Sequence, residues 1–108
     1  MTDAELAMLD MGAKSEEAAE LMRALSNGPR LLVLCHLMAA GELQAGELVR
    51  RIGLSQSAVS QHLARLREQG LIAYRRDAQA LHYRIADPRV ARMLGLLHDM
   101  FCPDLSGN

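Results

Sequence analysis

The chain has 108 residues and a net charge of −1, and half of its residues are apolar while only 3% are aromatic. This length allows one modest core and excludes a catalytic cleft between two domains, and the scarcity of aromatic rings favours packed helices over a β-sandwich. No apolar run approaches the roughly 18 residues of a membrane span and the N-terminus lacks the basic start of a signal peptide, so we expect a cytoplasmic protein without a membrane partner.

The charge is divided unevenly along the chain. Residues 1–46 hold three basic and seven acidic side chains, whereas residues 47–92 hold nine arginines and four acidic side chains. Because contact with phosphates needs positive charge gathered in one place, the second of these segments is the part of the chain suited to nucleic acid.

The first 40 residues predict three helices. Residues 3–11 form a short apolar segment that Gly12 interrupts, and Ser15 is placed to cap a second helix. A third helix is expected over residues 29–40, because a proline stands at its first position. It is apolar almost all round, which predicts a buried central helix, and it contains Cys35.

Residues 45–69 predict a helix-turn-helix. Its first helix spans residues 45–52, and a turn at Gly53 leads to Ser55, whose hydroxyl can cap a second helix over residues 56–69. Small polar side chains on that helix allow close approach to the major groove and offer hydrogen bonds to base edges, although an ordinary solvated face has the same composition. The predicted base contacts are Ser57, Ser60, Gln61 and His62, and the predicted phosphate contacts on this helix are Gln56 and Arg65.

Residues 71–86 alternate like two strands joined by a turn, which predicts a hairpin wing directly after the helix-turn-helix. Arg75 and Arg76 are candidate phosphate contacts, although charged side chains also protect sheet edges from unwanted pairing. Asp87 then caps a last helix with an apolar stripe, which ends at Cys102 before a short polar tail. The predicted class is α+β and mostly helical: one winged helix-turn-helix domain over residues 1–108 with a two-stranded wing.

Several motifs together resemble the ArsR/SmtB family of winged-helix repressors, over about residues 15–102. They are Pro29-Arg-Leu, Gly46-Glu-Leu, Leu54-Ser-Gln-Ser-Ala-Val-Ser-Gln-His-Leu, Leu66-Arg-Glu-Gln-Gly-Leu-Ile and His82-Tyr-Arg-Ile. The resemblance implies a homodimer joined through residues 1–26 and 87–102, which binds a pseudo-palindromic double-stranded DNA operator and leaves it when an inducer binds. No phosphate-binding glycine loop and no nucleophile spaced with a base occur, so no enzyme activity is predicted.

The sequence departs from the metal-sensing members of that family. Gln44 and Gly46 stand where those members carry a Cys-x-Cys pair, and Arg89 and Met100 stand where others carry histidines, although Asp87 is retained. Because these replacements lack suitable donor atoms, no metal and no other cofactor is predicted at those positions.

The two cysteines, Cys35 and Cys102, are placed similarly to the dithiol of the BigR/SqrR/HlyU-like branch of the family. The resemblance implies that reactive sulfur species or oxidants are sensed through a disulfide or polysulfide bridge. This is sensible chemistry, because one thiolate attacks a sulfane sulfur or a peroxide and the second thiol traps the product. The alternatives are an inert core cysteine, a metal-responsive repressor with Cys and His ligands, and a winged-helix interaction module that does not bind DNA.

Overall fold

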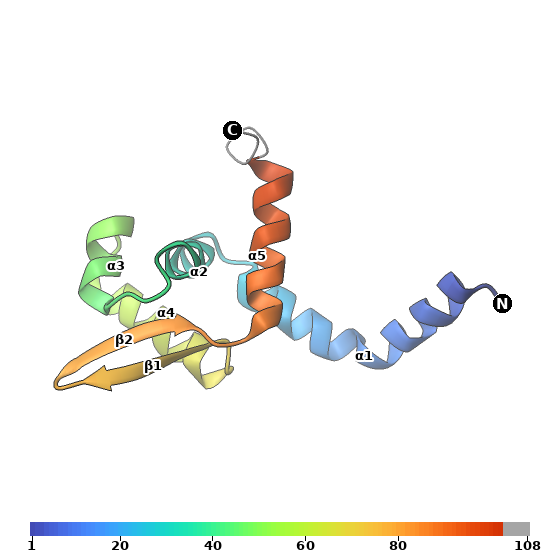
Figure 1. Ribbon diagram of the computed structural model, residues 1–108, viewed down its shortest axis with the longest axis horizontal. Helices are drawn as coiled ribbons and strands as arrows, with labels where there is room; N and C mark the ends of the chain where they lie inside the picture. The colour runs from blue at the N-terminus through green and yellow to red at the C-terminus, as the bar shows by residue number, and fades with distance from the viewer. Residues whose placement is uncertain (103–108) are drawn as a thin grey trace.

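The computed structural model describes residues 1–102, over which the chain forms five helices and a two-stranded sheet (Figure 1). The elements are α1 (Asp3–Leu25), α2 (Gly28–Ala40), α3 (Ala45–Ile52), α4 (Gln56–Glu68), β1 (Ile72–Asp77), β2 (Ala80–Ile85) and α5 (Pro88–Phe101). The predicted α+β winged helix-turn-helix is confirmed, while the polar tail lies outside the described residues. No helix within residues 1–102 combines the length and apolarity that crossing a membrane requires.

The N-terminal segment is one helix, so the predicted division into two helices at Gly12 is wrong. Thr2 caps the start of α1, because its hydroxyl accepts a hydrogen bond from the backbone N–H of Glu5 at 3.1 Å. Ser15 caps nothing and instead donates its hydroxyl to the carbonyl of Gly12 at 3.1 Å. A glycine inside a helix costs only about 1 kcal/mol relative to alanine, which is too little to end this helix. The N-terminal half of α1 projects away from the other elements (Figure 1).

The central helix is α2, which packs against α1, α3, α4, α5 and β2. Val33, Leu34 and Leu37 on one side of it are fully buried. The prediction that α2 is buried all round is wrong, because Leu32, Cys35 and Met38 on its other side are exposed. Further apolar side chains stand exposed on α1, α2 and α5: Leu6, Met8, Leu9, Met11, Met22, Leu32, Met38, Leu96, Met100 and Phe101.

The wing is an antiparallel hairpin in which Asp77 pairs with Ala80. Its turn therefore contains two residues, whereas the alternating pattern predicts a turn over the four residues 77–80. Its base is attached to the segment between α2 and α3. There the backbone of Leu43 donates to and accepts from the backbone of Tyr83, at 3.0 and 2.9 Å. The wing therefore holds a fixed position relative to the end of α2.

The turn of the wing contains a strained residue, Ala78, whose φ is +56°. A residue with a Cβ is disfavoured there by roughly 1–2 kcal/mol, whereas glycine adopts this φ readily. We expect Ala78→Gly to raise the free energy of unfolding by about 0.5–1 kcal/mol, measured by chemical denaturation. The matched control is Ala80→Gly, two residues away in β2, which is expected to lower it; equal effects of the two changes would contradict the explanation.

Candidate nucleic-acid interface and thiol pocket

The polar face of α4 is the centre of the candidate nucleic-acid interface. The hydroxyl of Ser55 accepts a hydrogen bond from the backbone N–H of Ala58 at 3.1 Å and fixes the first turn. Apolar side chains on the inner face, including Val59 and Leu63, are buried and hold the helix on the core. The structure brings four predicted residues together on the exposed side: Gln56, Ser57, Ser60 and Gln61.

Two other predicted residues of α4 lie beside that face, in a pocket at its flank. His62 is half-buried and Arg65 is exposed, and both line a hollow of about 430 Å³ together with Arg30 of α2. The pKa of His62 is held below its ordinary value by burial and by the nearby charges of Arg30 and Arg65. At neutral pH the imidazole is therefore uncharged, and it carries one hydrogen-bond donor and one acceptor.

One further arginine of α4, Arg67, contacts the wing. The guanidinium carbon of Arg67 lies 4.7 Å from the centre of the Tyr74 ring. Tyr74 in turn packs edge-on against Tyr83, with ring centres 5.5 Å apart. Arg67 therefore joins the end of α4 to the wing through a cation–π contact.

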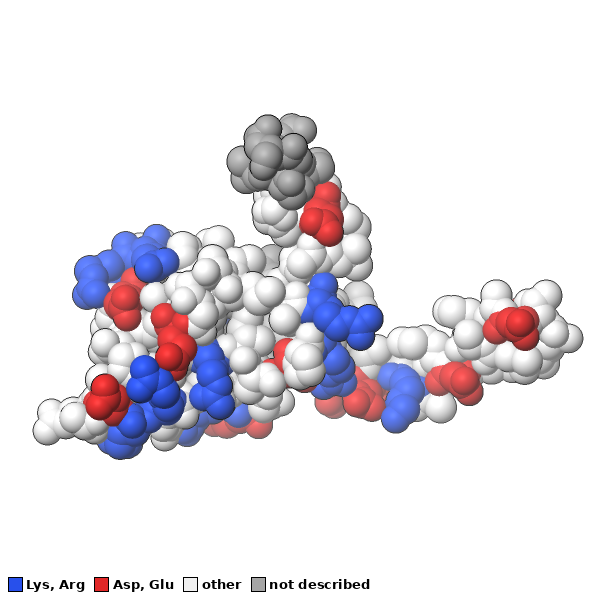
Figure 2. Space-filling view, viewed as in Figure 1, with Lys and Arg blue, Asp and Glu red and all other residues white. Residues whose placement is uncertain are grey.

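The two predicted phosphate contacts of the wing differ in their surroundings. Nε of Arg75 lies 2.8 Å from the carboxylate of Glu42, in the segment between α2 and α3. Arg76, in contrast, is exposed and forms no ion pair within residues 1–102. The pKa of Glu42 is lowered mainly by the hydrogen bond from Arg75, so this carboxylate stays charged. In Figure 2 basic side chains gather over α3 and the wing, with acidic ones among them. Glu42 thus offsets part of the positive charge of the wing.

Removing that acidic charge is expected to strengthen DNA binding. In Glu42→Gln, Arg75 loses its ionic partner and becomes free to contact a phosphate, which makes the slope of log affinity against log salt concentration more negative by about 0.9 for each wing that binds. The measurement is a fluorescence anisotropy titration of a random-sequence duplex at several salt concentrations. Glu16→Gln, at an exposed position on α1, is the control for a general change in net charge; if it steepens the salt dependence equally, the Arg75 contact is not responsible.

The two cysteines line one apolar pocket between α2 and α5. Cys35 projects from α2, and Cys102 ends α5, where its backbone N–H donates to the carbonyl of His98 at 2.7 Å. The pocket has a volume of about 350 Å³, and its other lining residues are Leu31, Leu94, Leu97, His98 and Phe101. Both thiols are free. Although Cys35 is exposed on one side, its pKa is raised by the partial burial of its thiol among these apolar groups and by the charge of Cys102. The structure therefore brings together two thiols that the sequence separates by most of its length.

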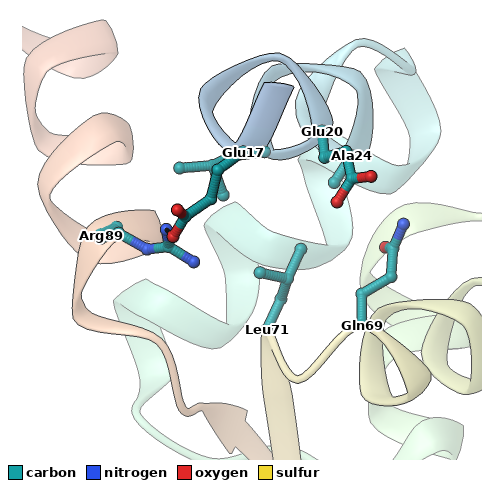
Figure 3. Close-up of a pocket in the computed structure, with 7 residues that line it drawn as sticks. Glu17, Glu20, Ala24, Gln69, Leu71 and Arg89 are labelled. Carbon is teal, nitrogen blue, oxygen red and sulfur yellow. Dashed lines mark hydrogen bonds and ion pairs between the residues drawn. The ribbon is translucent and has the colours of Figure 1, made fainter. Parts of the chain in front are cut away.

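The carboxylate retained from the metal-binding pattern is already engaged by an arginine. Asp87 accepts a hydrogen bond from Nη2 of Arg89 at 2.7 Å, which holds the pKa of Asp87 below its ordinary value. Nη1 of the same arginine lies 3.1 Å from the carboxylate of Glu17 of α1. Figure 3 shows the two side chains next to each other in a pocket lined by residues of α1, of α5 and of the segment between α4 and β1. Residues 1–102 contain no group of three or more potential ligand side chains arranged to hold a metal ion. The contacts of Arg89 with Asp87 and with Glu17 therefore connect the start of α5 to α1.

Sequence reasoning missed two residues of these sites, Arg30 and Glu42. Arg30 appeared only as part of the Pro29-Arg-Leu motif, and nothing marked it as buried. Its spacing from Asn27 was the available signal, because the side chain of Asn27 caps α2 by accepting a hydrogen bond from the N–H of Arg30 at 2.9 Å. Glu42 carries no local signal, since its partner Arg75 lies 33 residues away along the chain.

Comparison with known proteins gives consistent matches. A family model described as "Bacterial regulatory protein, arsR family" matches residues 27–74, from the cap of α2 to the first strand. The HTH-type transcriptional regulator YgaV of Escherichia coli is 48% identical over 99 residues, which cover 92% of this chain and 98% of that protein. Both matches include the whole helix-turn-helix.

Two solved structures extend the match to nearly the whole fold. The transcriptional repressor BigR from Xylella fastidiosa superposes with a TM-score of 0.82 at 35% identity, covering 94% of this chain and 98% of that one. Reduced HlyU from Vibrio cholerae superposes with a TM-score of 0.79 at 44% identity, covering 86% of this chain and 97% of that one. These proteins share with this chain both the helix-turn-helix and the helices around it.

Proposed function

Because the chain belongs to the arsR family of bacterial regulatory proteins, which are DNA-binding transcriptional regulators and not enzymes, we propose that it is a thiol-controlled repressor. It binds an operator through α4 and the wing, and it releases that operator when Cys35 and Cys102 react with a persulfide, polysulfide or oxidant. The single observation that carries this proposal is the apolar pocket that both thiols line.

The DNA-binding half of the proposal assigns different contacts to different side chains. Ser57, Ser60 and Gln61 contact base edges, because short polar side chains at the start of an exposed helix can both donate and accept hydrogen bonds in the major groove. Gln56, Arg65, Arg75 and Arg76 contact phosphates. His62 lies in the flanking pocket beside the base-reading face, so we assign it contacts to either a base edge or a phosphate.

The dimer half of the proposal rests on apolar surface. Many apolar side chains are exposed on two helices: the Leu and Met side chains of α1, and Leu96, Met100 and Phe101 of α5. A monomeric protein rarely exposes so much contiguous apolar surface. Regulators of this family are typically dimers. We propose that a second copy covers these helices, so that the two α4 helices bind the two halves of a pseudo-palindromic operator.

The sensing reaction needs no reagent besides the two thiols and the persulfide or peroxide. One cysteine thiolate attacks the outer sulfur of a persulfide RSSH, which releases RSH and leaves a cysteine persulfide. The second thiolate attacks the Sγ atom of the first cysteine and expels HS⁻, so the two thiols are oxidised to a disulfide and the persulfide is reduced to RSH and hydrogen sulfide. A peroxide follows the same course through a sulfenic acid and releases water. The new bridge joins α2 to the end of α5.

The experiment treats reduced protein with a low-molecular-weight persulfide, with hydrogen peroxide or with zinc, and follows intact mass and operator binding in parallel. The operator is the duplex selected by reduced protein from a random pool. The proposal expects an intramolecular bridge between Cys35 and Cys102 together with loss of operator binding. Stoichiometric zinc binding with operator release, and no response to persulfide, would favour a metal-responsive repressor instead.

The raised pKa of Cys35 predicts a definite pH dependence. Because the thiolate is the reactive form, a raised pKa leaves little of it at neutral pH, and the reaction rate is expected to rise about tenfold per pH unit until the pH passes the pKa. The measurement is the rate of iodoacetamide labelling of Cys35 in Cys102→Ser, followed by mass spectrometry, with free cysteine as the control. A rate that is already constant at neutral pH would show that the pKa is low.

A further inference from the structure

Arg30 is a buried cation that pairs with no carboxylate within residues 1–102. Only 9% of its surface is exposed, and its Nη2 donates to the backbone carbonyl of Arg23 at 2.9 Å. Its Nε is buried and has no hydrogen-bond partner within residues 1–102. It also forms no ion pair with any acidic side chain in that part of the chain. Burying a charge without a counter-ion is unfavourable. The buried guanidinium of Arg30 is therefore suited to bind an anion that is not part of this chain.

The surroundings of Arg30 suit such an anion. Arg30 lines the 430 Å³ hollow with Asn27 at the N-terminus of α2 and with Gln61, His62, Ala64, Arg65 and Glu68 of α4; we call this hollow the Arg30 pocket. The helix dipole of α2 places partial positive charge at its N-terminus. Arg65 adds a second cation, and the one acidic side chain of the lining is Glu68, three residues farther along α4.

We propose that the Arg30 pocket binds one phosphate of the DNA backbone while the exposed face of α4 lies in the major groove. Gln61 supports this placement, because it lines the pocket and also belongs to the base-facing side of α4. A phosphate beside a recognition helix therefore lies within reach of both surfaces. The inference rests on the proposed DNA-binding function and adds a contact that fixes the angle of α4 in the groove.

The chemistry of the lining matches a phosphate diester. A guanidinium offers several N–H donors in a planar fork, and an uncharged imidazole offers one more. The lowered pKa of His62 fits a pocket that is positive while no anion is bound. A bound phosphate reverses that influence, so the pKa of His62 is expected to rise when DNA binds.

The test removes the charge of Arg30 and the charge of individual DNA phosphates, separately and together. Each phosphate of the selected operator is replaced in turn by an uncharged methylphosphonate, and binding is measured for the wild-type protein and for Arg30→Met. We expect one phosphate in each half-site whose replacement weakens wild-type binding about tenfold but weakens the variant less than about twofold, because charge-assisted contacts act as a unit. The salt slope of the variant should fall by about 0.9 for each pocket lost.

Arg30→Met keeps the unbranched aliphatic part of the side chain, so its fold can be checked directly by circular dichroism and thermal melting. We expect a melting temperature equal to or above that of the wild type, because removal of an unpaired buried charge relieves the free protein. Arg92→Met, at an exposed position on α5, is the matched control and should leave the methylphosphonate profile unchanged. A profile in which no phosphate couples to Arg30 in a folded variant would overturn the inference.

Two arms separate the possible outcomes. If the reduced wild-type protein binds no duplex, the proposed function itself fails; if it binds but shows no coupling to Arg30, only the phosphate pocket fails. Inorganic phosphate, added at constant ionic strength, distinguishes a free anion from the DNA backbone. If it raises the melting temperature of the wild type but not of Arg30→Met, and no backbone phosphate couples, the pocket takes a free anion and the DNA assignment is wrong.

Discussion

The double variant Ser60→Ala and Gln61→Ala is expected to lose its preference for the selected operator over a random-sequence duplex. Both side chains are exposed on the base-facing side of α4, so the fold should be affected by no more than about 0.5 kcal/mol. A good base contact contributes about 1–3 kcal/mol of discrimination, so operator binding should weaken at least about tenfold. The measurement is a gel shift with both duplexes at one salt concentration.

The matched control is Gln69→Ala, which removes an exposed amide just beyond the end of α4. It should leave both affinities unchanged. If the double variant weakens binding to the two duplexes equally, Ser60 and Gln61 contact the backbone rather than the bases. If neither affinity changes, α4 does not enter the groove through this face, and an interaction module that does not bind DNA becomes the better explanation.

Cys35→Ser and Cys102→Ser are each expected to keep operator binding and to lose the response to persulfide. Wild-type affinity should fall by about 5–150-fold on oxidation, which is the usual range for coupling between two sites. Serine is close to cysteine in size but cannot form the bridge, so each single variant should stay bound. The measurement is the operator dissociation constant before and after persulfide, with intact mass recorded on the same samples.

The outcome of each single variant has a separate meaning. Release by Cys102→Ser after persulfide would show that modification of Cys35 alone is enough, and the bridging mechanism would be wrong. Release by the double variant Cys35→Ser and Cys102→Ser would show that neither thiol is the sensor. Reversal of wild-type release by a dithiol reductant is the control for irreversible damage, because sulfinic and sulfonic acids are not reduced by thiols.

The helix-turn-helix could be predicted from the sequence because its signals are local. Ser55 caps α4 as expected, and Gly70 follows the helix with a φ of +75°, as a terminating glycine does. Asp87 likewise caps α5 by accepting a hydrogen bond from the N–H of Arg89 at 2.9 Å. These contacts join residues close together in the chain, so the order of side chains alone predicts them. The spacing of polar groups on α4 was visible in the same way.

The charged contacts between different elements could not be predicted, because they join distant parts of the chain. Arg89 reaches Glu17 across 72 residues, and Arg75 reaches Glu42 across 33. No spacing rule distinguishes a wing arginine that is free from one that is paired. The exposure of Cys35 was missed for a related reason: the pattern of α2 shows that it is apolar all round, but not which of its sides this chain itself covers.

The uncovered apolar side chains of α1 have a consequence for how the protein behaves at low copy number. Where a second copy supplies the missing contacts, folding and association form one equilibrium, and each tenfold dilution removes about 1.4 kcal/mol of stability per mole of dimer. Operator DNA that binds two copies at once opposes this loss by mass action. In a cell with few molecules of the protein, the copies bound to the operator would then be more stable than the free copies.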